Sequence, residues 1–567
     1  MKEKYSTIGR LLSAKTLFFL TTTVLAIPNI ALCFTERMGF WASAANVVLP
    51  VAAVWLFMSL CRRPGKAALL LFPFMFLAAF QTVLLYLFGH SIIAVDMFLN
   101  LVTTNPGEAM ELLDNLVPAV ATVVVVYVPV IALAVVSLRR GDVLAHDFMQ
   151  RQRRLAASAL GAGLVLLGAS YMTDKDYRAE LDLYPANVIY NLALAVDRTE
   201  ATEHYAETSA GFKFHSRDCG KADGRRVFVL VIGETARADN FSIYGYGRPT
   251  TPRLQGMQGL TAYAEALTQS NTTHKSVPML MSAASAEDYD RIYREKGIIT
   301  AFKEAGYHTT FISNQRPNHS FIDIFGEEAD QWVFLKEKAA DPETVTDQQM
   351  LALVDNVLAK GRKKEFIVLH TYGSHFNYRE RYDRKDAFFK PDEASEADPK
   401  NRPQLLNAYD NTIRATDRLL ATLATKLRGT GCQSAMLYTS DHGENIFDDR
   451  RRLFLHASPV PSYYELHVPF LVWLSPRYSA DNPQEATAIR ANRSKAVATN
   501  LSVFHTMLGL AHICTPLKDD RLSLASPAYT PRRTVYLNDH NLAVPVSKIL
   551  RDEEDFAMFR KKGIRIY

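Results

Sequence analysis

The sequence predicts a two-part fold: a helical membrane domain of five spans, followed by an α/β domain with a mainly parallel central sheet. Five apolar stretches precede residue 175, and each is long enough to cross about 30 Å of hydrocarbon as a helix. After residue 225, short β-branched runs alternate with helical stretches, as in a parallel sheet covered by helices. A chain of 567 residues also exceeds the size of a single hydrophobic core.

The predicted spans are 16–34, 41–61, 67–89, 117–138 and 155–173. The first follows a basic stretch but lacks a small-residue cleavage site, so we expect an anchor and not a removed signal peptide. Prolines inside the spans are compatible with packed membrane helices, because neighbouring groups satisfy the carbonyls that they free. These are Pro28, Pro50, Pro73 and Pro129.

The distribution of basic residues predicts how the chain crosses the membrane. Lysines and arginines precede the first span, follow the second and separate the fourth from the fifth, whereas the loops on the opposite side carry only Arg37. Cytoplasmic loops are enriched in such residues, so the amino terminus is predicted inside. Five spans then place everything after residue 173 outside, which predicts a multi-pass inner-membrane protein with its soluble domain in the periplasm.

Three polar residues recur at a spacing of four in the loop between the third and fourth spans: Asn100, Thr104 and Glu108. This spacing aligns side chains on one face of a helix. Two interpretations stay open, the solvated face of an amphipathic surface helix and a polar lip that receives a lipid headgroup.

Composition limits the partners and the covalent links. The net charge of +5 is scattered and builds no basic face, so nucleic acid is not an expected partner. Cys33 and Cys61 lie in apolar spans, which leaves Cys219, Cys432 and Cys514 in the soluble half. Three cysteines have room for one disulfide and one free thiol, and their spacing does not decide the pairing.

The expected boundaries are a transmembrane domain at 1–173, a linker at 174–225 and a soluble domain at 226–567. The linker contains an amphipathic patch, LYPANVIYNLALAV, which is typical of a helix lying on a surface. Strands are predicted in the soluble domain at 226–233, 308–313, 365–370, 434–440 and 469–475.

Acidic and imidazole groups follow several of these strands. Glu234 follows the first, His375 comes shortly after the third, and Asp441 and His442 follow the fourth. One such residue is usually structural, but the carboxyl ends of parallel strands meet at one edge of a sheet, where ligands bind. Oxygen and nitrogen donors converging at one point are what metal ions such as zinc require. The sequence therefore predicts a metal site.

The segments VIGETARADNFSIYGYGRPTTP, SNTTHKSVPM, SDHGEN and LFLHASP resemble the phosphoethanolamine transferases that modify lipid A, lipopolysaccharide core or other surface glycans. This family is a membrane branch of the alkaline phosphatase/sulfatase superfamily, and the resemblance extends over nearly the whole chain. It implies a periplasmic, sulfatase-like catalytic domain at 226–567 behind the five-helix anchor.

The resemblance also implies residue roles. Glu234, Asp441 and His442 correspond to zinc ligands, with zinc expected in preference to manganese, and Thr273 completes the site as nucleophile. The neighbouring Thr272 is the alternative nucleophile. Two histidines correspond to those near the transferred group, where they bind phosphate and a second zinc or protonate the leaving oxygen. The alternative for each is an ordinary surface or core histidine without a role in the reaction. These are His375 and His456, and the loop trio Asn100, Thr104 and Glu108 completes the expected substrate-binding residues.

The implied reaction is transfer of phosphoethanolamine from phosphatidylethanolamine to a lipopolysaccharide, at lipid A or core, or to another surface glycan. A covalent phosphothreonine would be the intermediate, and membrane lipids would be partners. The residue types suit this chemistry, since an alcohol is a poor nucleophile at neutral pH and a divalent metal activates it.

One departure and three rival functions accompany this expectation. Many lipid A members flank the nucleophile with disulfide-forming cysteines, whereas this chain has Asn271 and Met279 there, which leaves the acceptor open. A glycerol-phosphate transferase of the lipoteichoic-acid-synthase kind would use phosphatidylglycerol and often manganese. Sulfatase activity requires a Cys or Ser in a C/S-x-P-x-R setting that SNTTHKSVPM lacks. A sensor with an inactive hydrolase domain would not need the intact metal and nucleophile residues.

Overall fold

The computed structural model describes residues 13–88, 92–103, 117–175, 177–220, 224–339, 345–393 and 398–566. The chain divides into two compact units. The first comprises Met1–Val102 and Pro106–Arg198, and the second comprises Thr103–Asn105 and Thr199–Tyr567.

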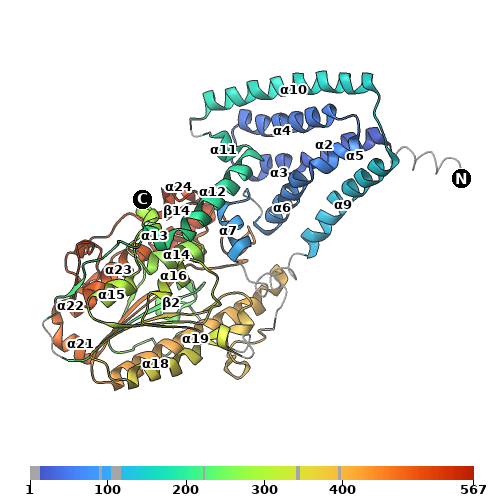
Figure 1. The fold of residues 1–567 in the computed structure, drawn as a ribbon. Coiled ribbons are helices and arrows are strands. Elements are labelled where there is room, and N and C mark those ends of the chain that lie inside the picture. Colours follow the sequence, from blue (N-terminus) through green and yellow to red (C-terminus); the bar gives the residue numbers. More distant parts are fainter. Residues whose placement is uncertain are drawn as a thin grey trace. The chain divides into compact units, whose positions relative to one another are not determined.

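The first unit is helical (Figure 1). Its described helices are α2 (Ala14–Leu25), α3 (Ile27–Thr35), α4 (Phe40–Leu60), α5 (Pro64–Leu70), α6 (Phe72–Phe88), α7 (Val95–Thr103), α9 (Val117–Arg140), α10 (His146–Thr173), α11 (Ala179–Asp182) and α12 (Ala186–Glu203), the last of which runs on into the second unit. The amphipathic patch of the predicted linker forms α12.

The helical membrane region is confirmed, with four or five spans. Four helical segments are long and apolar enough to cross a membrane: Ala14–Thr35, Phe40–Leu60, Pro118–Arg140 and His146–Thr173. The predicted third span is a pair of helices, Pro64–Leu70 and Phe72–Tyr86, bent by 56°, and it makes a fifth if the pair counts as one span. Pro73 is the second residue of α6, next to the bend, whereas Pro50 and Pro129 lie inside the unbroken helices α4 and α9.

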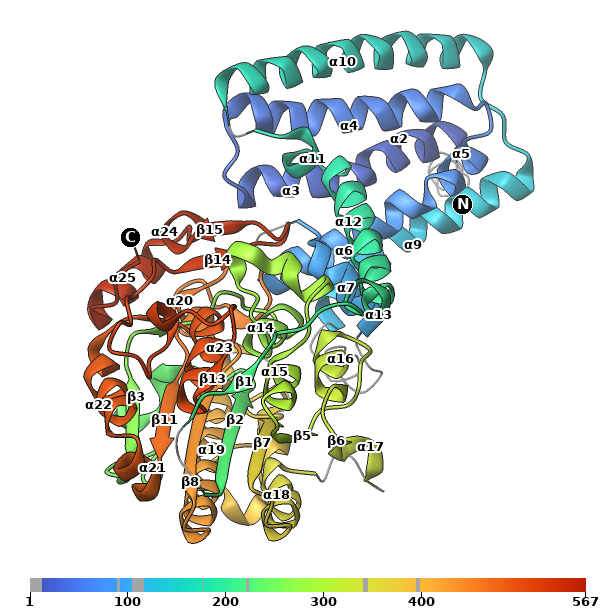
Figure 2. The same ribbon diagram turned by 60° about the vertical axis from the view of Figure 1, so that its left-hand side comes forward.

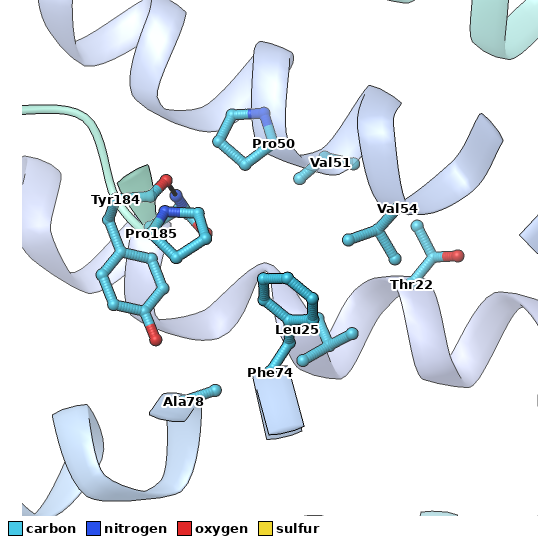
Figure 3. Close-up of a pocket in the computed structure, with 10 residues that line it drawn as sticks. Thr22, Leu25, Pro50, Val51, Val54, Phe74, Ala78, Tyr184 and Pro185 are labelled. Atoms are coloured by element: carbon cyan, nitrogen blue, oxygen red, sulfur yellow. Dashed lines mark hydrogen bonds between the residues drawn. The ribbon is translucent and has the colours of Figure 1, made fainter. Parts of the chain in front are cut away.

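Small and amide side chains hold the membrane helices together. A Cβ added to Gly163 on α10 would lie 2.9 Å from the Leu49 Cα of α4, so glycine permits this close approach. Asn29 on α3 donates from Nδ2 to the Asn46 carbonyl at 2.7 Å and to the Tyr184 carbonyl at 2.9 Å. A small, mainly apolar cavity lies beside these bonds (Figure 3). Its lining residues are Thr22, Leu25, Asn29, Pro50, Val51, Val54, Phe74, Ala78, Tyr184 and Pro185.

The second unit contains a seven-stranded sheet (Figure 2). Its order is β3 (Leu260–Tyr263), β11 (Phe470–Leu474), β8 (Gln433–Ser440), β2 (Arg226–Gly233), β7 (Lys364–His370), β5 (His308–Ser313) and β6 (Gln331–Phe334). The predicted mainly parallel sheet is confirmed, since the pairs from β8 to β6 are all parallel. Only β11 runs against its two neighbours.

Both faces of the sheet are covered. Along β2, Phe228, Leu230 and Ile232 face one apolar cluster, and the alternate valines of the same strand face another. This explains the continuous apolar run of the strand, because a strand buried on both faces has no polar side. The first cluster packs under α14 (Thr273–Leu280), α15 (Ile298–Glu304) and α23 (Thr499–Leu510), and the second under α18 (Met350–Ala359) and α19 (Arg402–Gly429) (Figure 2).

Shorter elements complete the described part of this unit. The helices are α13 (Tyr205–Thr208), α16 (Phe321–Glu327), α17 (Leu335–Lys338), α20 (Tyr463–Leu466), α21 (Pro476–Asp481), α22 (Pro483–Ala491), α24 (Val546–Ile549) and α25 (Glu553–Lys562). The strands are β1 (Arg217–Asp218), β4 (Ala266–Leu267), β9 (Asn445–Ile446), β10 (Phe454–Leu455), β12 (Val497–Ala498), β13 (Ile513–Cys514), β14 (Val535–Leu537) and β15 (Ala543–Pro545).

A disulfide fastens the start of this unit to its interior. Cys219 is bonded to Cys514, next to the antiparallel pair of β1 and β13. Cys432 is buried and free. The sequence had allowed one disulfide and one free thiol among these three cysteines, and the structure supplies the pairing.

Replacing Cys514 by serine is expected to lower the free energy of unfolding of the second unit by about 2–5 kcal/mol. The disulfide joins residues 295 positions apart, so its loss frees a long loop in the unfolded chain. Denaturant unfolding followed by circular dichroism measures the change. Cys432→Ser, which removes a buried thiol without breaking a covalent link, is the control and should shift the transition much less. An unchanged midpoint for Cys514→Ser would contradict the expectation.

Candidate metal centre

The centre is built at the carboxyl ends of β2, β8 and β7. Gly233 and Ser440 are paired in register at the ends of β2 and β8, and the Asp441 amide donates to the Gly233 carbonyl at 3.0 Å. This pairing places the two following acids, Glu234 and Asp441, side by side. From the loop after β7, the Ser374 amide donates to the Glu234 carbonyl at 2.9 Å.

Backbone geometry at Thr235 and Gly373 shapes this edge of the sheet. Thr235 has a φ of 62°, an uncommon conformation for a residue with a Cβ, and its amide donates to Asp441 Oδ1 at 3.1 Å. Gly373 has a φ of 52°, and an added Cβ would lie 2.6 Å from the Glu234 carbonyl oxygen. Glycine is therefore required where the β7 loop passes Glu234.

Thr273 presents its hydroxyl to the acid and imidazole groups. Thr273 Oγ1 lies 3.1 Å from Glu234 Oε1, 3.3 Å from Glu234 Oε2 and 3.1 Å from His442 Nε2. It is the first residue of α14, where the unpaired amides of a helix favour negative charge. The neighbouring Thr272 instead pairs its hydroxyl with Ser270 Oγ at 3.1 Å.

Three histidines line the centre. The rings of His442 and His456 lie 4.2 Å apart, and those of His456 and His375 lie 6.0 Å apart. His456 Nδ1 is 3.2 Å from Glu444 Oε1. His375 stacks on Tyr372 at 5.3 Å.

Burial dominates the electrostatics of the centre. It raises the pKa of Glu234 to about 7, with further help from Asp441, and raises the pKa of Asp441 to about 7. It lowers the pKa of both His442 and His456 to about 4. The protein thus holds close, buried carboxylates next to neutral imidazoles, an arrangement that a bound cation would stabilise.

The donor set fits a divalent metal ion. Ligand atoms of Glu234, His442 and His456 all lie within 4.8 Å of one another. Asp441 Oδ1 accepts bonds from two backbone amides, whereas its buried Oδ2 has no hydrogen-bond partner among the described residues and lies 3.2 Å from His442 Nε2. An unpaired carboxylate oxygen beside carboxylate and imidazole donors matches the oxygen and nitrogen ligands of zinc.

The structure brings together most of the site residues predicted from the sequence. Those at this edge of the second unit are Glu234, Thr273, His375, Asp441, His442 and His456. Asn100 lies in α7, and Thr104 and Glu108 lie outside the described residues.

Two contacting residues were missed by the sequence analysis. Gln315, shortly after β5, donates from Nε2 to Glu234 Oε2 and to the Thr371 carbonyl, both at 3.1 Å. Glu444 is fully buried and holds His456. Their position after strand ends is the signal that could have found them, since Gln315 follows β5 as Glu234 follows β2. Both orient groups that contact the candidate metal position.

The architecture of the second unit matches a known protein family. The sulfatase family model matches residues 226–513, which is just over half of the chain and includes β2, α14 and β8. The chain belongs to the sulfatase family. This confirms the predicted membership of the alkaline phosphatase/sulfatase superfamily for a chain that also carries a helical membrane region.

Curated relatives of this sulfatase-family chain include phosphoethanolamine transferases. It is 28% identical over 307 residues to Kdo(2)-lipid A phosphoethanolamine 7''-transferase of Salmonella typhimurium, covering 52% of this chain and 53% of the relative. It is 25% identical over 314 residues to phosphoethanolamine transferase EptC of Escherichia coli, covering 54% of each. The chain thus matches about half the length of these relatives.

Solved structures share the fold. The integral membrane lipooligosaccharide phosphoethanolamine transferase A of Neisseria meningitidis matches with a TM-score of 0.72 at 20% identity, covering 90% of this chain and 98% of that one. Its soluble domain, solved separately, matches with a TM-score of 0.51 at 26% identity, covering 56% and 97%. The periplasmic domain of Escherichia coli EptC in complex with Zn matches with a TM-score of 0.54 at 22% identity, covering 60% and 97%.

Proposed function

We propose that this protein transfers phosphoethanolamine from phosphatidylethanolamine to a lipopolysaccharide, at lipid A or core, or to another surface glycan. The observation that carries the proposal is the Thr273 hydroxyl at a helix start, 3.1 Å from both Glu234 Oε1 and His442 Nε2. A hydroxyl held among metal-ligating groups is an activated nucleophile. Relatives named as phosphoethanolamine transferases, one of them a lipid A transferase, support phosphoethanolamine as the transferred group and a lipopolysaccharide as the acceptor.

In the first step, Thr273 Oγ1 gives up its proton to a neighbouring base of the centre and forms a bond to the phosphorus of the donor lipid. The bond between that phosphorus and the glycerol oxygen breaks, and diacylglycerol leaves after its oxygen takes up a proton. A phosphoethanolamine-threonine remains on the enzyme. His375 and His456 line the same centre, where they either bind the phosphoryl oxygens or supply that proton.

In the second step, a hydroxyl oxygen of the acceptor, which loses its proton, or a phosphate oxygen attacks the same phosphorus. The bond between Thr273 Oγ1 and phosphorus breaks, and Oγ1 takes up a proton. Donor and acceptor therefore occupy the centre in turn, which is a ping-pong sequence. The start of α14 favours the negative charge that builds up on the phosphoryl oxygens in both steps.

We propose zinc as the resident ion, held by Glu234, Asp441, His442 and the Thr273 hydroxyl. When bound, zinc would favour the alkoxide form of Thr273 and neutralise phosphoryl oxygens. The oxygen and nitrogen donors and the unpaired Asp441 Oδ2 support this assignment. The zinc complex solved for Escherichia coli EptC is consistent with it.

The domain plan follows from the chemistry. Residues 1–173 would anchor the protein in the inner membrane, 174–225 would link, and 226–567 would act in the periplasm. Both substrates are membrane components, so a membrane-tethered catalytic domain meets them at a raised effective concentration. Asn100, Thr104 and Glu108 remain proposed headgroup-binding residues in this plan.

Mass spectrometry of lipids and glycans from cells with and without the gene tests the proposal. We expect a phosphoethanolamine increment on a surface glycolipid only when the gene is present. The purified protein incubated with phosphatidylethanolamine should gain the same group on Thr273. A glycerol-phosphate adduct formed from phosphatidylglycerol would replace our proposal with the glycerol-phosphate alternative, and no adduct with either lipid would overturn both.

A further inference from the structure

Asn271 is a buried polar residue two positions before Thr273, with 1% of its surface exposed. Its Nδ2 donates to the Ser458 carbonyl at 2.8 Å and to Glu465 Oε1 at 2.7 Å. Its Oδ1 accepts a bond from the Tyr536 hydroxyl at 2.6 Å. One amide thus bonds to the stretch 458–465 and to Tyr536, both distant from it in the sequence, and these bonds use three of its four hydrogen-bonding positions.

The bond to Ser458 reaches the loop that carries His456. Ser458 lies two residues after His456, just as Asn271 lies two residues before Thr273. Around His456 the backbone is irregular, because Leu455 and Ala457 have φ values of 64° and 65°. The pairing of β10 with β9 holds the loop before His456, and the bond from Asn271 to Ser458 holds it after His456.

The bonds to Glu465 and Tyr536 hold Asn271 itself in place. Glu465 is fully buried, and its Oε2 accepts a bond from the Ser462 amide at 2.7 Å in the capping box of α20. Tyr536 belongs to β14 and is 3% exposed. The amide therefore sits between two rigid, buried supports, and its rotation would break several bonds at once.

A different amide fixes α14 to the metal-binding edge. Asn500 Nδ2 donates to Ser276 Oγ at 2.8 Å, and Ser276 Oγ in turn donates to the Asp441 carbonyl at 2.7 Å. Loss of Asn271 would leave this second connection intact. The two amides therefore have separate roles. Asn500 connects α14 to Asp441 through Ser276, and Asn271 connects the segment before Thr273 to the loop that carries His456.

We propose that Asn271 is a positioning residue that sets the distance between Thr273 and His456. The inference rests on the proposed function for its catalytic consequence, and it adds a residue that does not contact substrate. Without the amide, the two loops are expected to move independently while Glu234, Asp441 and His442 stay in place. Misplacement of a reacting group by about 1 Å costs on the order of 100-fold in rate.

Asn271→Ala in the full-length protein tests this inference. We expect kcat to fall by about 10–100-fold, with KM and the amount of bound zinc unchanged. Hydrogen exchange should rise together in the segments 271–276 and 454–460. Asn271→Ser is the second variant, because its smaller polar side chain admits water to Glu465 and Tyr536 and protects folding while still not reaching Ser458.

Asn492→Ala is the matched control. Asn492 is 2% exposed, and its Nδ2 donates to the carbonyls of Leu524 and Ser526, both at 3.0 Å. Its loss should lower stability without lowering kcat in protein that remains folded. Equal kcat values for the Asn271 and Asn492 variants, or an exchange increase confined to one of the two segments, would overturn the inference. Hydrogen exchange needs no turnover, so coupled exchange in a protein without transferase activity would refute the proposed function alone.

Discussion

Thr273→Ala is expected to lower transfer by at least about 10³-fold, because removal of an attacking nucleophile leaves only binding and electrostatic effects. The hydroxyl is the group held against Glu234 and His442, and alanine cannot form the covalent intermediate. Intact-mass measurement after incubation with phosphatidylethanolamine should show no adduct on the variant. A coupled assay of diacylglycerol release measures the rate.

Thr272→Ala is the control for this experiment. Thr272 is 5% exposed, and its hydroxyl pairs with Ser270, so its loss should leave adduct formation largely intact. An adduct that persists in Thr273→Ala and disappears in Thr272→Ala would assign the nucleophile to the other threonine. Persistence in both variants would remove the threonine intermediate from the mechanism.

Glu234→Gln is expected to weaken zinc binding and lower transfer by at least about 100-fold. Mutation of residues that only hydrogen-bond to metal ligands already lowers metal affinity or activity by 10–100-fold. This variant replaces a proposed direct ligand with a neutral amide. The metal-free variant should also melt at a higher temperature than the metal-free parent. Burial and the neighbouring Asp441 disfavour the Glu234 carboxylate, so neutralising it relieves a cost that bound metal otherwise offsets. Plasma mass spectrometry and thermal melts with and without zinc measure both effects.

Asp323→Asn supplies the matched comparison. Asp323 is 5% exposed and accepts bonds from two backbone amides, those of Asn318 and His319, both at 2.6 Å. Burial raises the pKa of this carboxyl to about 6. Asp323 is nevertheless not part of the candidate metal cluster found among the described residues. Zinc content and transfer should therefore stay near those of the parent. Equal zinc loss in both variants would show that Glu234 acts only through general stability.

Local sequence pattern predicted the strands because their apolar runs are unambiguous. The runs at 226–233 and 308–313 coincide with β2 and β5. The direction of β11 was not predictable, since an apolar run at 469–475 is the same for a parallel and an antiparallel buried strand. The edge strands β3 and β6 were also missed. They are only partly buried, so they lack the continuous apolar run that marked the central strands.

The centre was partly predictable for a topological reason. Glu234, Asp441 and His442 directly follow parallel strands, and the ends of such strands converge. Gln315 shares this signal because it follows β5, whereas Asn271 has none, because a polar residue in a loop looks alike whether it is solvated or buried. Their roles depend on contacts with residues distant in the sequence, such as Gln315 with Glu234 and Asn271 with Ser458. The partner of Cys219 was hidden for the same reason.

Anomalous diffraction at the zinc absorption edge, from crystals of the full-length protein grown with zinc, tests the central claim most directly. We predict an anomalous peak about 2.0–2.2 Å from donor atoms of Glu234, Asp441 and His442, with Thr273 Oγ1 completing the coordination. A peak at other residues only, or no peak at the ends of β2 and β8 in zinc-saturated crystals, would contradict it.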